Sequence, residues 1–113
     1  MPLTRETFPI SENPVVLRPA NVTHLVKLGE PWNSTCQVTG NPVPKIEWKR
    51  MDGNGNGNVA VNQKWDNNKE VVLLLESVSE QDIGTYFCIA VNSKGIAVAF
   101  MELGRLTDRK SVV

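Results

Sequence analysis

Short runs of alternating apolar and polar residues recur along this chain. The segment 45–50 shows the pattern clearly, because Ile46 and Trp48 alternate with charged residues. A period of two is typical of a strand with one buried and one exposed face. The sequence therefore predicts an all-β chain, with strands at 15–17, 22–28, 32–38, 45–50, 70–78, 87–91 and 96–103.

Turn-forming residues separate these runs. Gly, Pro and Asn are concentrated at 39–44 and at 92–95, which are typical of a loop and of a tight hairpin turn. Gly and Asn alternate from 53 to 58, and this favours a flexible loop. Pro19 cannot donate a hydrogen bond to a ladder, so it marks a point where the first strand could pass from one sheet to the other.

The segment 82–88 carries the most specific pattern, Asp-x-Gly-x-Tyr-x-Cys. Gly84 allows a sharp turn because it has no Cβ, and Asp82 is expected to pair or cap around that turn. Leu73 and Leu75 precede the motif on a strand and are expected to point inward. Cys88 lies 52 residues after Cys36, the other cysteine of the chain. These two form either one disulfide or a pair of buried thiols.

Together these residues resemble the immunoglobulin fold over roughly residues 15–103. The positions that match are Cys36, Trp48, Leu73, Asp82, Gly84, Tyr86 and Cys88. The stretches 42–48 and 88–95 look like the intermediate (I-set) class, which occurs in cell-adhesion molecules, receptor ectodomains and muscle proteins.

The resemblance implies an all-β, two-sheet Greek-key sandwich with one inter-sheet disulfide, Cys36–Cys88. It also implies that Trp48 packs over this disulfide and that the Tyr86 hydroxyl bonds to upstream backbone. The domain is expected at 14–104, with a linker or tail at 1–13 and an exit linker at 105–113.

A narrower similarity points to the third, membrane-proximal immunoglobulin domain of fibroblast growth factor receptors. It is carried by the segments 19–23, 29–30, 44–49, 68–74 and 92–96. This similarity implies that loops and the entry linker contact a growth factor. The segment 53–65 departs from that family, as do Trp32 and Ser34, which stand where smaller or more apolar residues are expected.

Composition and sequence motifs limit the classes of partner and the cellular compartment that can be expected. The formal net charge is zero, so no basic excess points to nucleic acid. No apolar run approaches the roughly 18 residues of a membrane span, so direct membrane insertion is not expected. Asn21 and Asn33 each begin an Asn-x-Thr triplet of the glycosylation type. With a disulfide, these sequons favour an extracellular glycoprotein.

No catalytic or cofactor pattern is present in the sequence. His24 is the single histidine, and no spacing gives it a nucleophile or a metal-binding set. The Gly-Asn run lacks the Lys-Ser/Thr of a phosphate loop. We therefore expect a binding module without enzyme activity, cofactor or metal.

The alternation on the last two strands predicts a partner-binding face. If Tyr86 and Cys88 point inward, the residues between them and their neighbours on the next strand point outward. This set consists of Phe87, Ile89, Val91, Ile96, Val98 and Phe100. In the opposite register of the last strand, Val98 and Phe100 would be buried and Ala97, Ala99 and Met101 exposed.

The connecting loops are a second candidate for binding. They are predicted at 40–43, 59–68 and 92–94, and their candidate contact residues are Asn41, Val43, Trp65 and Lys94. Trp65 either caps one end of the core or is exposed for binding. Lys64 and Lys69 could contribute to heparan sulfate binding, although two lysines in a neutral domain are more often simply solvated.

Two functions follow from the sequence. The first is an extracellular module of a cell-surface receptor or adhesion protein that recognises a protein ligand, or a second copy of itself. The second is an intracellular structural I-set module of a muscle protein. Redox and glycan state distinguish them, because disulfides and N-glycans belong to secreted material.

Overall fold

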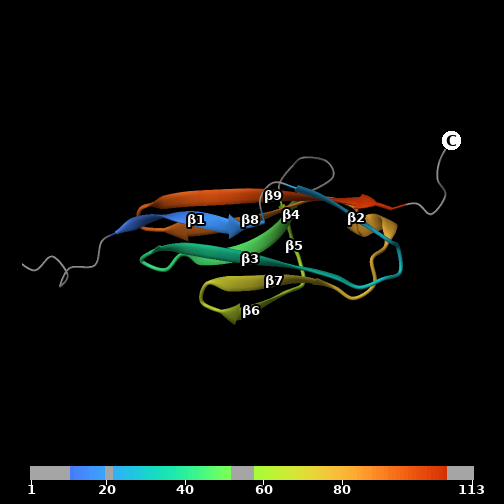
Figure 1. Cartoon of the computed structure of the whole chain (residues 1–113), viewed down its shortest axis with the longest axis horizontal. Helices are drawn as coiled ribbons and strands as arrows, with labels where there is room; N and C mark the ends of the chain where they lie inside the picture. Colours follow the sequence, from blue (N-terminus) through green and yellow to red (C-terminus); the bar gives the residue numbers. More distant parts are fainter. Residues whose placement is uncertain (1–10, 20–21, 52–57, 107–113) are drawn as a thin grey trace, which may run out of the picture.

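The computed structural model describes residues 11–19, 22–51 and 58–106, which form two stacked β-sheets (Figure 1). One sheet has four strands in the order β1 (Glu12–Arg18), β3 (Trp32–Asn41), β7 (Glu70–Leu75) and β6 (Gln63–Asn67). The other has five, β2 (Val22–Val26), β9 (Gly95–Arg105), β8 (Gly84–Asn92), β4 (Lys45–Met51) and β5 (Asn58–Ala60). The predicted all-β sandwich is confirmed.

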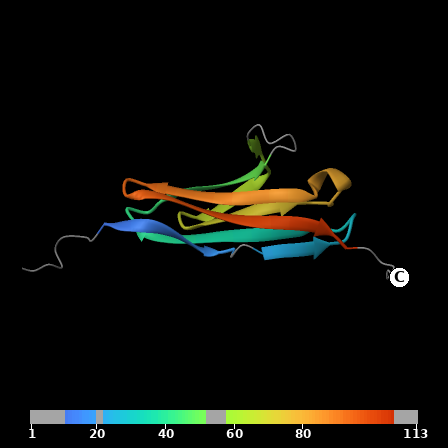
Figure 2. The ribbon, with the colours of Figure 1, turned by 90° about the horizontal axis from the view of Figure 1, so that it is seen from above.

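The first strand region divides between the two sheets. β1 pairs antiparallel with β3, whereas β2 pairs parallel with β9 in the opposite sheet. The change of sheet falls between Arg18 and Val22, at the proline that cannot donate to a ladder. Figure 2 shows β2 alongside the far end of β9, where it covers the sheet edge from Met101 to Arg105.

The core lies between the sheets and is centred on the disulfide between Cys36 and Cys88. Both cysteines and Trp48 are fully buried. The indole Nε1 of Trp48 donates to the carbonyl of Val71 at 3.0 Å, so its polar atom is satisfied inside the core. The cysteine pair is thus a disulfide and not two thiols.

The Asp-x-Gly-x-Tyr-x-Cys motif forms a closed corner before β8. The Tyr86 hydroxyl donates to the Asp82 carbonyl at 2.6 Å, and Tyr86 itself is 1% exposed. Asp82 ends the 3₁₀ turn η2 (Glu80–Asp82), and its carboxylate accepts from the Ser79 backbone at 2.8 Å. Gly84 has a φ of 149°, a conformation that favours glycine.

The expected loop at 59–68 is wrong, because this segment contains most of β5 and all of β6. β6 pairs with β7, with Gln63 opposite Leu73 and Trp65 opposite Val71. β6 is an edge strand, and its outer face is exposed to solvent. Its residues are therefore mostly polar, and their sequence shows no strong strand pattern. The Gly-Asn run at 53–57 and both outer tails lie largely outside the described residues. The domain limits at 14 and 104 stay predictions.

Candidate binding surface

Six apolar side chains point outward from β8 and β9 and form what we call the β8–β9 face. The register of the two strands places them side by side in rows, with Phe87 opposite Phe100, Ile89 opposite Val98 and Val91 opposite Ile96. The rings of Phe87 and Phe100 are in contact, with centroids 5.9 Å apart. The residues named from the sequence thus lie together in one continuous array.

The exposures of these side chains decide between the two possible registers of β9. Ile96 is 65% exposed, Phe100 45% and Val98 42%, while the intervening Ala99 and Met101 are buried. Val98 and Phe100 therefore point to solvent. Val91 is also exposed, and Phe87 and Ile89 are half-buried. An exposed apolar array of this kind is typical of a contact site.

Charged residues of β4 border the β8–β9 face on one side. Lys45 lies opposite Val91, Glu47 opposite Ile89 and Lys49 opposite Phe87 in the ladder, so each row of the array begins with a charge. The Lys49 ammonium is 3.8 Å from the Glu47 carboxylate. The face thus has an apolar centre and a polar border of alternating sign, an arrangement common in protein interfaces.

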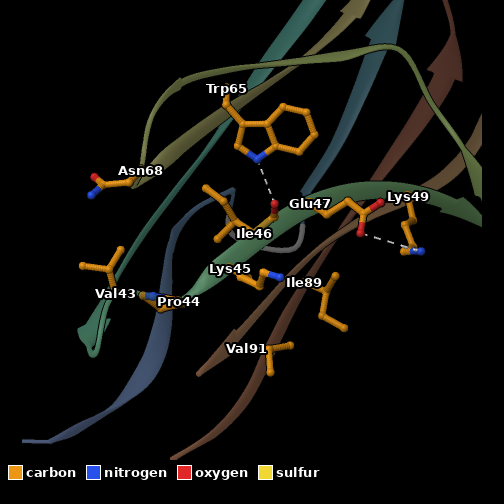
Figure 3. Close-up of a pocket in the computed structure, with 10 residues that line it drawn as sticks. All are labelled: Val43, Pro44, Lys45, Ile46, Glu47, Lys49, Trp65, Asn68, Ile89 and Val91. Carbon is orange, nitrogen blue, oxygen red and sulfur yellow. Dashed lines mark hydrogen bonds and ion pairs between the residues drawn. The ribbon is translucent and has the colours of Figure 1, made fainter. Parts of the chain in front are cut away.

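A groove of about 920 Å³ continues the face over the edge of β4 (Figure 3). In Figure 3, Ile89 and Val91 lie on one side of it, Trp65 on the other, and Val43 and Pro44 at one end. The close-up shows the outward β4 side chains between these two sides. The apolar surface therefore extends beyond the six residues of the β8–β9 face.

Trp65 lies on strand β6 and not in a loop, which corrects its predicted place. Because its neighbour across the ladder is the buried Val71, its side chain points toward the opposite sheet. Its Nε1 donates to the Ile46 carbonyl at 2.9 Å, and it remains 51% exposed. The ring therefore both closes the open side of the sandwich and presents surface to the groove.

Sequence reasoning missed Gln63, which performs the same function one position earlier on that face of β6. Its amide oxygen accepts from the Trp48 backbone N–H at 2.6 Å, and its amide nitrogen donates to the Trp48 carbonyl at 3.1 Å. The two side chains satisfy backbone groups of β4 that no strand pairs with. The alternation of Gln63 and Trp65 with Lys64 and Asp66 was the available signal.

The other predicted loop residues lie at one end of the sandwich. Asn41 ends β3, Val43 is exposed in the following turn, and Lys94 is exposed in the β8–β9 turn. Asn92, which was not predicted, joins this end, because its amide nitrogen donates to the carbonyls of Glu12 and Pro42 at 2.8 and 2.9 Å. Val43 lines the groove with Trp65, whereas Asn41 and Lys94 do not.

The predicted modification and basic residues lie elsewhere. Asn33 is exposed on β3, and it is adjacent to Leu74 on the outer side of the four-stranded sheet. That sheet is opposite the one that carries the β8–β9 face. Lys64 and Lys69 are exposed on β6 and in the turn after it. Asn21 lies outside the described residues.

Among the titratable groups of the described residues, the Tyr86 hydroxyl in the core has a shifted pKa. Burial raises the pKa of the Tyr86 hydroxyl above its usual value of 10.0; the nearby Arg50 opposes this shift and Asp82 adds to it. The Arg50 guanidinium lies 5.6 Å from the Tyr86 ring and donates to the Ile83 carbonyl. The described residues contain no cluster of acidic, His or Cys side chains able to hold a metal.

The geometry above defines an immunoglobulin sandwich, and the sequence comparison agrees. Residues 13–92 match the family model described as an immunoglobulin domain. The chain belongs to this family. In the described residues, no helix has the length and apolar character needed to cross a bilayer.

The relatives include adhesion proteins and titin domains. Human contactin-2 is 40% identical over 77 residues, which is 68% of this chain and 6% of that protein. The cell adhesion molecule Dscam1 of Drosophila melanogaster is 37% identical over 72% of this chain and 4% of its own length. The chain thus spans a small part of these relatives.

A solved structure of the titin M10–obscurin-like 1 Ig complex contains a chain with the same fold. Its TM-score is 0.68 at 26% identity, and the match covers 88% of this chain and 99% of that one. Because adhesion proteins and titin domains both match, the compartment is left open by the comparisons.

Proposed function

We propose that this chain is an extracellular immunoglobulin-type binding module of a cell-surface receptor or adhesion protein. It recognises a protein partner through the β8–β9 face. The exposed apolar array from Val91 to Phe100 carries the proposal, because a soluble domain rarely leaves such a surface without a partner. A growth factor as that partner, inferred from receptor similarity, stays a prediction.

Two features support the extracellular part of the proposal. The Cys36–Cys88 disulfide is of the kind that persists in oxidising compartments. Asn33 is exposed, so its side chain is accessible for glycosylation. A glycan at that site would cover the opposite sheet and leave the β8–β9 face open.

Substitution of Val98 by lysine tests the binding face. We expect Val98→Lys to abolish binding of the secreted, disulfide-bonded chain to partner-bearing cells, because it places a charge at the centre of a dry contact. Lys64→Glu on β6 is the matched control, since Lys64 is also exposed but lies on the other sheet. Equal cell binding by Val98→Lys and the unmodified chain, with both folded, would exclude this face.

A structural module of an intracellular muscle protein is the second candidate function. The similarity to a chain of the titin complex, at 26% identity over nearly its full length, favours it. The redox and glycan state of the protein isolated from its natural source decides between the two candidate functions. A mass shift on reduction together with a glycan at Asn33 supports the extracellular module, whereas free thiols and an unmodified Asn33 support the muscle module.

A further inference from the structure

We propose that the partner on the β8–β9 face is a second copy of this chain, bound through the same face about a two-fold axis. This inference rests on the proposed function, because it names the occupant of the surface that the proposed function uses. A two-fold interface needs a self-complementary surface, in which one patch meets its own copy. Both the apolar rows and the charges of β4 meet that requirement.

The charges of β4 alternate in sign along the face. Lys45, Glu47 and Lys49 all point outward from one strand, at successive rows of the array. A row of charges that alternate in sign pairs favourably with a reversed copy of itself only in certain registers. If the axis passed through the row of Glu47, this residue would face itself and Lys45 would face Lys49. Like charges that face each other across the interface in this way disfavour association.

An axis between the rows of Glu47 and Lys49, perpendicular to the strands, gives opposite charges instead. Glu47 then faces Lys49 of the second copy, and Lys49 faces Glu47, so two reciprocal pairs form. The same axis places Ile89 against Phe87 and Val98 against Phe100 of the other copy. The largest side chains of the face are therefore at the centre of the contact, with the charges at its border.

Shifting the axis one row toward the turn also pairs opposite charges, Lys45 with Glu47. That arrangement places Phe87 and Phe100 outside the overlap and leaves the 45%-exposed Phe100 ring in water. The axis between Glu47 and Lys49 buries more apolar surface and is preferred for that reason. Facing sheets commonly pack within about 30° of parallel, which is compatible with this contact.

The remaining features agree with self-association. The formal net charge of the chain is zero, so two copies do not repel each other at long range. The apolar array consists of six side chains, fewer than the roughly 20–30 residues per partner of a stable interface. We therefore expect weak, concentration-dependent dimers, which many copies on apposed surfaces would strengthen by avidity.

A charge-exchange experiment tests the arrangement. In Glu47→Lys, a lysine at 47 faces Lys49 of the other copy, and in Lys49→Glu two glutamates face each other. Each variant alone should associate roughly tenfold more weakly than the unmodified chain. In a 1:1 mixture the lysine variant meets the glutamate variant, so both charge pairs across the interface have opposite sign. Association should then return to within about threefold of that of the unmodified chain.

Sedimentation equilibrium of the oxidised 113-residue chain up to millimolar concentration measures this, with Lys64→Glu as the charge control. The Lys49–Glu47 contact within one chain is lost in both variants and is not regained in the mixture. Recovery on mixing therefore reports contact between copies. A mixture as weak as its components overturns the two-fold arrangement.

A second measurement separates this inference from the proposed function. A chain that stays monomeric at millimolar concentration overturns the homophilic partner. If Val98→Lys still abolishes binding to cells in that case, the face binds a different protein and the proposed function stands. If Val98→Lys neither weakens self-association nor changes cell binding, both proposals are wrong.

Discussion

At the scale of single residues, the Tyr86 hydroxyl is the polar group on which the corner before β8 depends. It donates to the Asp82 carbonyl at 2.6 Å, while the ring is buried against the core. A phenylalanine fills the same space but cannot donate. A difference in stability between the Tyr86→Phe variant and the unmodified chain can therefore be attributed to one hydrogen bond.

We expect Tyr86→Phe to lower the free energy of unfolding by about 1–2 kcal/mol, because the Asp82 carbonyl loses its donor. Urea denaturation measures this change through the transition midpoint. Phe100→Leu on the exposed face is a comparison that leaves the corner intact. A Tyr86→Phe midpoint equal to that of the unmodified chain would show that water replaces the bond.

The same hydroxyl predicts a dependence of stability on alkaline pH. Burial raises the pKa of Tyr86 in the folded chain above its unfolded value near 10.0. A raised pKa gives stability that is complete below the unfolded value and is lost as pH rises through the folded value. We expect unfolding free energy to fall above about pH 10, and to fall less in Tyr86→Phe. If the unfolding free energy of the two proteins falls in parallel with pH, Tyr86 is not the group responsible.

At the scale of elements, the open edge of β4 is covered by side chains and not by a strand. Gln63 binds both backbone groups of Trp48, and Trp65 binds the carbonyl of Ile46. β5 pairs with β4 only from Lys49 to Met51. An uncovered edge invites pairing with other chains, so these two side chains protect it.

Gln63→Ala should lower the unfolding free energy by about 1–3 kcal/mol, because it leaves the Trp48 N–H and carbonyl without partners near the core. Lys64→Ala is the matched control on the solvent side of β6 and should change stability by less than about 0.5 kcal/mol. Thermal or urea unfolding of the pair provides the test. Equal losses in both variants would indicate a general effect on β6.

The elements also show where sequence patterns were sufficient. Strands with one buried face, such as β4 and β8, were predicted because apolar and polar residues alternate there. β6 was not, because Gln63 and Trp65 point inward at an edge where polar atoms can still reach backbone partners. Its pattern of a glutamine and a tryptophan among charged residues does not indicate burial.

At the scale of the whole molecule, the disulfide joins the two sheets across 52 residues. The loop-entropy relation for a closed loop of this length gives a stabilisation of about 4 kcal/mol. The replacement of both cysteines by alanine should therefore reduce the unfolding free energy by about that amount, as measured by urea denaturation at neutral pH. A change below about 1 kcal/mol would show that the core alone holds the sheets together.

The candidate face was partly accessible from sequence for a simple reason. Once Tyr86 and Cys88 are placed in the core, the pleat forces Phe87 and Ile89 to the other side. The register of β9 was open, because its small residues and its large ones are both apolar. Pairing with β8 placed Ala99 and Met101 inside and Val98 outside.

The sequence by itself determined the strands in which apolar and polar residues alternate, such as β8, because local periodicity specifies them. The immunoglobulin sandwich and its disulfide were implied by the resemblance of a few spaced residues to that family. Only the tertiary structure decided the register of β9, the position of Trp65 over the β4 edge, and the alignment of Lys45, Glu47 and Lys49 with the apolar rows. These features depend on contacts between segments far apart in the chain. Side-chain alternation within one strand carries no information on which residues of another strand lie opposite.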